Sequence, residues 1–97
     1  MYTEMIGQHV VVRSPPSGVW MGVLVAAEGR TRKLRDARRA WQWTGAASSA
    51  GLAVEGPSGG KITSPVPLAV IDDVCETLAV TDAALARWAA IAAWRAR

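Results

Sequence analysis

The chain has 97 residues, of which 51% are hydrophobic and 20% are charged, and its formal net charge is +3 at pH 7. This length predicts a single domain over residues 1–97, too small for the deep private cleft that most enzymes need. The composition excludes a disordered chain, and no apolar run approaches the roughly 20 residues of a membrane-spanning helix. With no signal-peptide pattern at its start, the chain is expected in the cytoplasm.

The first half of the chain predicts an antiparallel meander, because short strand patterns follow one another through tight turns. The second strand pattern is apolar on both faces, which predicts a central strand, and Gly22 within it leaves room for a backbone or a ligand to approach. Asp36 breaks the pattern between the third strand and the fourth. The four predicted strands are Gln8 to Arg13, Val19 to Ala27, Arg30 to Leu34 and Arg38 to Thr44.

The middle of the chain predicts loops around two short strands. Gly45 to Gly51 is small and glycine-flanked, which predicts a loop or a single helical turn with free amides and hydroxyls. Leu52 to Val54 and Lys61 to Ser64 are expected to be strands, joined by a turn over Gly56 to Gly60. That turn is similar to a phosphate-binding loop, but its glycine spacing and the following Pro65 argue against nucleotide hydrolysis.

The C-terminal part predicts further β-structure and one helix. Pro65 and Pro67 interrupt the strand pattern, which resumes over Val70 to Val80 as one or two strands. A helix with an apolar stripe is expected from Thr81 to about Arg95. The expected fold class is therefore mainly β (α+β), a small antiparallel sheet or barrel over residues 1–80 with one C-terminal helix over residues 81–95.

The usage of cysteine and histidine limits the chemistry. Cys75 is the only cysteine, and its apolar neighbours predict that it is buried; His9 is the only histidine. These counts exclude an intrachain disulfide and argue against a zinc site of the usual kind. No serine has an obvious base nearby in sequence, so we expect no enzymatic activity, no metal and no cofactor.

The strongest functional signal is the stretch of two arginines followed by two tryptophans. On an extended strand Arg39, Trp41 and Trp43 share one face, with Arg38 on the other. Guanidinium groups beside flat aromatic surfaces suit a ligand with phosphates and bases. The alternative is that the tryptophans are core residues and the arginines a solvated flank. The candidate ligand-binding residues are Arg38, Arg39, Trp41, Trp43, Ser48, Ser49, Lys61 and Trp20.

The Ala-Arg-Arg-x-Trp-x-Trp pattern at residues 37–43, with the pieces around it, resembles a family of small tailed-phage proteins of unknown function over about residues 5–84. In size and chemistry the chain is also similar to phage anti-CBASS and anti-Thoeris sponges, which sequester cyclic-nucleotide signals of bacterial immunity. This likeness implies a non-catalytic homo-oligomer in the host cytoplasm that binds a cyclic nucleotide. It further implies that both arginines hold phosphates, that Trp41 or Trp43 stacks a base, and that Ser48 or Ser49 reaches the sugar or base edges.

Two other functions stay open. Six of the eleven Lys and Arg residues lie within Arg30 to Arg39, which favours a small DNA- or RNA-binding module that contacts phosphates and unpaired bases. The third possibility is a phage structural protein or host-protein adaptor that uses the helix bearing Trp88 and Trp94 as its contact. If the helix is not such a contact surface, Trp88 and Trp94 are expected to pack within the domain or between copies of the chain. None of these functions involves a membrane.

Overall fold

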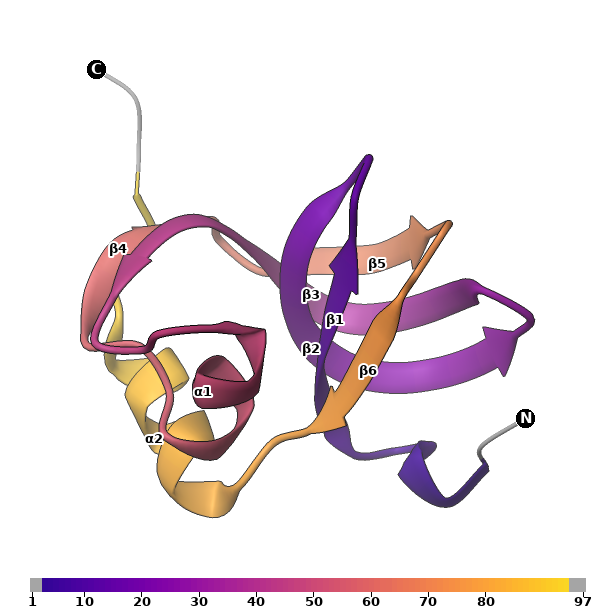
Figure 1. Ribbon diagram of the computed structural model, residues 1–97, viewed down its shortest axis with the longest axis horizontal. Helices are drawn as coiled ribbons and strands as arrows, with labels where there is room; N and C mark the ends of the chain where they lie inside the picture. The colour runs from indigo at the N-terminus through magenta and orange to yellow at the C-terminus, as the bar shows by residue number, and fades with distance from the viewer. Residues whose placement is uncertain (1–2, 95–97) are drawn as a thin grey trace.

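The computed structural model describes residues 3–94, and its centre is a six-stranded antiparallel sheet that curls on itself (Figure 1). The strand order is β4-β3-β2-β1-β6, and β5 also pairs with β3. The strands are β1 (His9–Ser14), β2 (Gly18–Glu28), β3 (Thr31–Thr44), β4 (Gly59–Ile62), β5 (Val66–Ile71) and β6 (Glu76–Ala79). The helices are η1 (Thr3–Met5), α1 (Ser49–Val54) and α2 (Asp82–Ala90). This arrangement confirms the predicted mainly β fold with a C-terminal helix.

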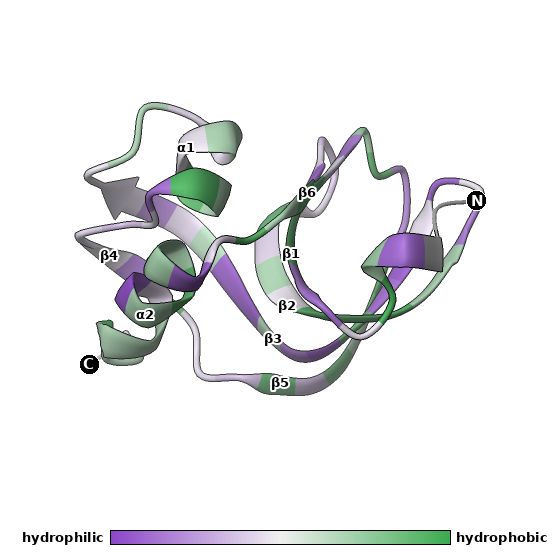
Figure 2. Ribbon diagram, turned by 90° about the horizontal axis from the view of Figure 1, so that it is seen from below, coloured by the Kyte–Doolittle hydropathy of each residue, from purple (hydrophilic) through white to green (hydrophobic). Residues whose placement is uncertain are grey.

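Both faces of the sheet are apolar, and each face builds its own core. The inner core fills the curl of the sheet, while α1 and α2 cover the other face near one end of the strands and close the helix core (Figure 2). The inner core consists of Val10, Val12, Leu24, Leu34, Ala37, Ala69, Ile71 and Val74. The helix core consists of Val11, Val19, Met21, Ala40, Leu52, Ala53, Ile62 and Trp88. The position of β2 between β1 and β3 confirms the central strand that its sequence predicts.

A β-bulge keeps β3 continuous where the sequence predicts a break. Asp36 adopts a φ of 52°, and the pairing of β3 with β2 shifts between Met21 and Val23. Gly22 lies opposite this bulge, and a Cβ atom built on it would lie 2.9 Å from the carbonyl oxygen of Arg35. The expectation that a backbone approaches Gly22 is therefore confirmed, and the backbone is that of β3.

Two other expected elements differ from the structure. Leu52 to Val54 is the end of α1 and not a strand, because Ser48 caps this helix by accepting a hydrogen bond from the Gly51 N–H at 3.2 Å. Pro67 lies inside β5, where it is tolerated because β5 is an edge strand that pairs only with β3 among the described residues.

The C-terminal helix begins where the sequence predicts and ends earlier. Thr81 is its N-cap, and its hydroxyl oxygen accepts a hydrogen bond from the Ala84 N–H at 3.0 Å. The helix ends at Ala90 because Ile91 has an extended backbone conformation. The expected end at Arg95 lies outside the described residues. Trp88 is fully buried, which confirms its packing role.

The contact at Gly22 predicts that Gly22→Ala destabilises the fold by about 1–3 kcal/mol, because the new methyl group must displace the β3 backbone. Chemical denaturation measures this change. The matched control is Asp36→Gly, which alters the same bulge without adding atoms and suits its positive φ. Equal stability of the two variants would show that the close approach does not constrain the sheet.

Candidate functional site

Arg38 is occupied within the protein and is not available to a ligand. Its Nε donates to the carbonyl oxygen of Thr63 at 2.8 Å, Nη1 to that of Trp88 at 2.6 Å and Nη2 to that of Ile91 at 2.7 Å. The residue is 7% exposed, and burial lowers the pKa of its guanidinium, which nevertheless stays protonated. Two of the carbonyls lie at the C-terminal end of α2, where a cation is favourable. Arg38 therefore has a structural role instead of the predicted contact with phosphate.

Trp43 lies on a different face from the one predicted. The pairing between β3 and β4 shifts by one residue between Ala40 and Gln42, which turns Trp43 to the side of the helix core. There its ring is partly buried, and its Nε1 donates to the carbonyl oxygen of Ala46 at 3.1 Å. A regular alternation of side chains would have left this indole beside Trp41, so the bulge removes it from the candidate site.

Both candidate serines also have partners within the protein. The Ser48 hydroxyl caps α1, and the Ser49 hydroxyl donates to Oε1 of Glu76 at 2.6 Å. The same carboxylate oxygen accepts a hydrogen bond from Nε of Arg13 at 2.8 Å. The pKa of Glu76 is lowered, first by the Ser49 hydrogen bond and then by Arg13. These contacts join α1 to β1 and β6, and neither serine lies among the accessible aromatic and basic residues described next.

Three of the predicted residues share one face at the end of the sheet formed by β3 and β4. Arg39 and Trp41 flank Ala40, and Lys61 precedes Ile62. Because Ala40 and Ile62 are buried in the helix core, the side chains of their neighbours on the strands point to the opposite face. This face is therefore free of the two helices.

Trp94, which the sequence analysis did not include in the site, completes this group. Its backbone N–H donates to the carbonyl oxygen of Ile62 at 2.9 Å, which fixes the segment after α2 against β4. Its ring lies 5.3 Å from that of Trp41, centroid to centroid, at an interplanar angle of 88°. The Nζ atom of Lys61 lies 5.1 Å from the Trp94 ring centroid. We call Arg39, Trp41, Lys61 and Trp94 the platform.

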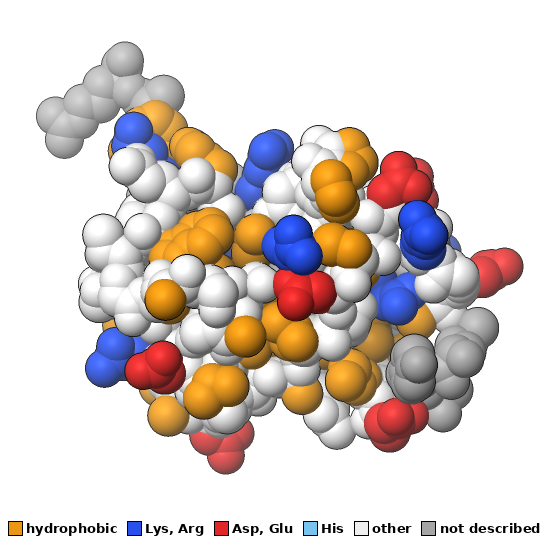
Figure 3. Space-filling model, viewed as in Figure 1, with side chains coloured by type: hydrophobic (Ala, Val, Ile, Leu, Met, Phe, Trp, Pro, Cys, Tyr) orange, Lys and Arg blue, Asp and Glu red, His pale blue; other side chains and the backbone are white. Residues whose placement is uncertain are grey.

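The platform is accessible. Trp41 is 45% exposed and Trp94 is 41% exposed. Arg39 is exposed, and its side chain makes no hydrogen bond or ion pair with any residue in the described range 3–94. Figure 3 shows hydrophobic and basic side chains next to one another beside the end of the described chain. Two indoles and the Arg39 guanidinium are thus open to a ligand, and Lys61, which is partly buried, places its ammonium over the Trp94 ring.

Trp20 borders the platform. It pairs with Arg39 across β2 and β3, and the guanidinium of Arg39 lies so close to Gly18 that a Cβ atom there would be 3.2 Å from Nε. The Trp20 ring packs against the inner core, and its Nε1 donates to the carbonyl oxygen of Ser17 at 3.0 Å. Trp20 therefore supports the edge of the platform and offers a ligand only part of its ring.

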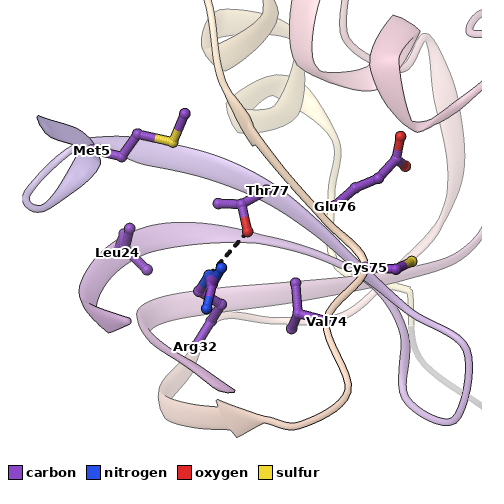
Figure 4. Close-up of a pocket in the computed structure, with 7 residues that line it drawn as sticks. All are labelled: Met5, Leu24, Arg32, Val74, Cys75, Glu76 and Thr77. Atoms are coloured by element: carbon purple, nitrogen blue, oxygen red, sulfur yellow. Dashed lines mark hydrogen bonds between the residues drawn. The ribbon is translucent and has the colours of Figure 1, made fainter. Parts of the chain in front are cut away.

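A separate cavity of 270 Å³ opens beside the inner core (Figure 4). Arg32 and Thr77 point toward each other within it, joined by a 3.0 Å hydrogen bond from Nε to Oγ1. This bond links β3 to β6, and Nη1 of Arg32 also donates to the nearby carbonyl oxygens of Gly29 and Thr31. The cavity is lined by Met5, Leu24, Arg32, Val74, Cys75, Glu76 and Thr77. None of the predicted ligand-binding residues lines it.

Cys75 is exposed, so the expectation that it is buried is wrong. Its neighbour Val74 faces the inner core instead, while the thiol of Cys75 donates to the carbonyl oxygen of Arg13 at 3.3 Å. Within residues 3–94, no group of three His, Cys, Asp or Glu side chains is placed to hold a metal ion. No helix in that part of the chain has the length and apolar character needed to cross a membrane.

The two adjacent arginines should differ sharply in their effect on stability. Arg38→Ala leaves three carbonyl oxygens without their charged donor, and we expect a loss of about 2–4 kcal/mol of unfolding free energy. Arg39→Ala is the matched control and should change the unfolding free energy by about 0.5 kcal/mol or less, because the exposed side chain that it removes makes no hydrogen bond or ion pair within residues 3–94. Urea denaturation compares the two. A larger loss for Arg39→Ala would contradict the assignment of their roles.

The hydrogen bond from Ser49 predicts a pH effect at Glu76. Because the pKa of Glu76 is lower in the folded state, its contacts stabilise the fold above the ordinary glutamate pKa, and this stabilisation is lost as the pH falls through the lowered value. Ser49→Ala should move the titration midpoint of the Glu76 carboxyl upward toward the ordinary value, as measured by NMR. An unchanged midpoint would show that the hydroxyl does not bind the carboxylate in solution.

Comparison with known proteins gives a family match. No curated protein and no solved structure is significantly similar to the chain. Residues 7–88 match a family described as a domain of unknown function (DUF6948). The matched range contains all six strands, α1 and most of α2, with three of the four platform residues, and it ends before Trp94. The chain therefore belongs to this family, the domain of unknown function DUF6948.

Proposed function

We propose that the platform binds single-stranded nucleic acid and that the protein acts without catalysis. The observation that carries this proposal is the presence of two exposed indoles and two cations on one face, contributed by β3, β4 and the segment after α2. Indole rings stack on unpaired bases with little regard to sequence, and Arg and Lys contact the phosphates between them. The net charge of +3 favours the same anionic ligand.

The open shape of the platform favours a single strand of nucleic acid as the ligand over a small molecule that must be enclosed. Arg39 and Trp41 are two residues apart on β3, which places them about 7 Å apart along the strand. This distance lets one nucleotide contact a cation through its phosphate and an indole through its base. Because neither helix covers this face, the nucleic-acid strand can continue beyond the platform in both directions.

Sequestration of a cyclic nucleotide is the second candidate, and the perpendicular indoles favour it. At an interplanar angle of 88°, one base can stack on one ring while its edge meets the face of the other. A second copy of the chain would then have to cover the ligand, so this function requires a homo-oligomer. A phage origin and an anti-defence role belong to this candidate. Under either proposal the protein works in the cytoplasm, where both ligand classes occur.

Titration of a labelled eight-nucleotide strand, followed by fluorescence anisotropy, tests the first proposal. Arg39→Ala and Trp41→Ala should each weaken binding by about tenfold, since stacking of a base on an aromatic ring contributes about 1–3 kcal/mol. Lys61→Ala should reduce the magnitude of the slope of log affinity against log salt by about one, which corresponds to the loss of one phosphate contact. Lys33→Ala, which removes an exposed cation outside the platform, is the matched control and should leave the affinity nearly unchanged.

Calorimetry with cyclic di- and trinucleotides, combined with native mass spectrometry, separates the two candidates. Binding of the eight-nucleotide strand that weakens with salt and depends on Trp41 supports the first proposal. Strand binding that is insensitive to Trp41→Ala would contradict it. Tight binding of a cyclic nucleotide by an oligomer, without strand binding, would establish the second candidate instead.

A further inference from the structure

A second surface, on the opposite face of the sheet from the platform, combines exposed apolar side chains with two cations. Val25 on β2 is 43% exposed, and Leu68 and Val70 on β5 are 55% and 56% exposed. Lys33 and Arg35 are exposed on β3, the strand between β2 and β5. Figure 2 shows the largely hydrophilic β3 beside the more hydrophobic β5.

The register of the strands places these residues in two neighbouring rows across the sheet. One row is Val23, Arg35 and Leu68, and the next is Ala26, Lys33 and Val70. Val25 bulges out beside the second row, where the pairing shifts between Leu24 and Ala26. A central column of two cations therefore has apolar residues on each side, and the exposed one on β2 is Val25. We call this surface the cationic sheet face.

The cationic sheet face continues the face that the helices cover elsewhere. Met21 belongs to the helix core, and Val23 lies two residues further along the same strand and so on the same face. Leu34 points to the inner core, so Lys33 and Arg35 on either side of it point outward. Val23 itself is only 7% exposed, whereas Val25, Leu68 and Val70 are each more than 40% exposed. The apolar surface open to a partner is therefore formed by these last three side chains.

The distribution of charge selects among possible occupants. A second copy docked by twofold symmetry would bring the two cation columns together, which is unfavourable. A lipid surface would require cations at the periphery of the apolar patch, not at its centre. Arg35 has an ion pair with Asp36 at 3.4 Å, but both side chains are about 60% exposed, so this pair is weak and Arg35 can take another partner.

We propose that the cationic sheet face docks an amphipathic helix of a partner protein, whose contact surface carries a central row of carboxylates flanked by apolar side chains. Neighbouring strands lie about 4.8 Å apart, so the apolar residues on β2 and those on β5 are separated by about 10 Å, the width of one helix. The carboxylates meet Lys33 and Arg35, while the apolar side chains cover Val25 on β2 and the exposed side chains on β5. A contact this small corresponds to a transient complex, with an affinity in the micromolar range or weaker.

A designed helical peptide provides a direct test. The probe carries glutamates in a central row with leucines on both sides, and the control peptide has lysines in place of the glutamates. Titration of the isotope-labelled protein, followed by NMR, should shift backbone signals of β2, β3 and β5 with the glutamate peptide only. The double variant Lys33→Glu with Arg35→Glu should weaken this binding by about tenfold, because it replaces two attractive contacts with repulsive ones.

Arg39→Ala serves as the matched variant, since it removes a cation on the platform and should leave peptide binding unchanged. This result separates the docking proposal from the proposed nucleic-acid function, which depends on Arg39. The docking proposal is overturned if the glutamate peptide causes no shifts at millimolar concentration, if the lysine peptide binds equally well, or if the shifts lie outside the three strands.

Discussion

The hydrogen bonds from the Arg38 guanidinium to three backbone carbonyls join the parts of the molecule that form the platform. The carbonyl of Thr63 follows β4, and those of Trp88 and Ile91 lie at the end of α2. By holding both segments against β3, Arg38 directs the chain after α2 along β4, where the N–H of Trp94 binds Ile62. The contact between the indoles of Trp94 and Trp41 is a consequence of this buried cation.

One long strand places its basic residues in three different environments along its length. Near its start β3 presents Lys33 and Arg35 outward, in its middle it buries Arg38, and near its end it exposes Arg39 and Trp41. Two bulges make these changes possible, because each adds a residue and reverses the face that later side chains occupy. The separation of roles between adjacent arginines follows from the alternation of a strand, in which neighbouring residues face opposite sides.

Sequence patterns predicted individual strands and helices correctly where the apolar periodicity is strong. Val19 to Ala27 gave a correct central strand, and Thr81 gave the correct start of the C-terminal helix. Leu52 to Val54 was predicted wrongly because three apolar residues fit a strand and a buried helical turn equally well. The cap at Ser48 was the signal for the helix, and glycine at position 51 obscured it.

The candidate site was only partly predictable, because its composition depends on contacts far apart in the sequence. Arg39, Trp41 and Lys61 follow from residue type and strand alternation. Trp94 enters the platform because its backbone N–H donates to the carbonyl oxygen of Ile62, 32 positions earlier in the chain. No local sequence pattern encodes such a long-range contact. Arg38 binds carbonyl oxygens, which every residue possesses, so its structural role leaves no trace in the sequence.

The indole N–H signals in a two-dimensional NMR spectrum test the central claim most directly. Trp20, Trp43 and Trp88 donate their indole N–H groups to backbone carbonyls, whereas Trp41 and Trp94 lie on the platform. Addition of an unlabelled eight-nucleotide strand should shift the signals of Trp41 and Trp94 and leave that of Trp88 in place. Shifts confined to the other three tryptophans, or no shifts at all, would contradict the account.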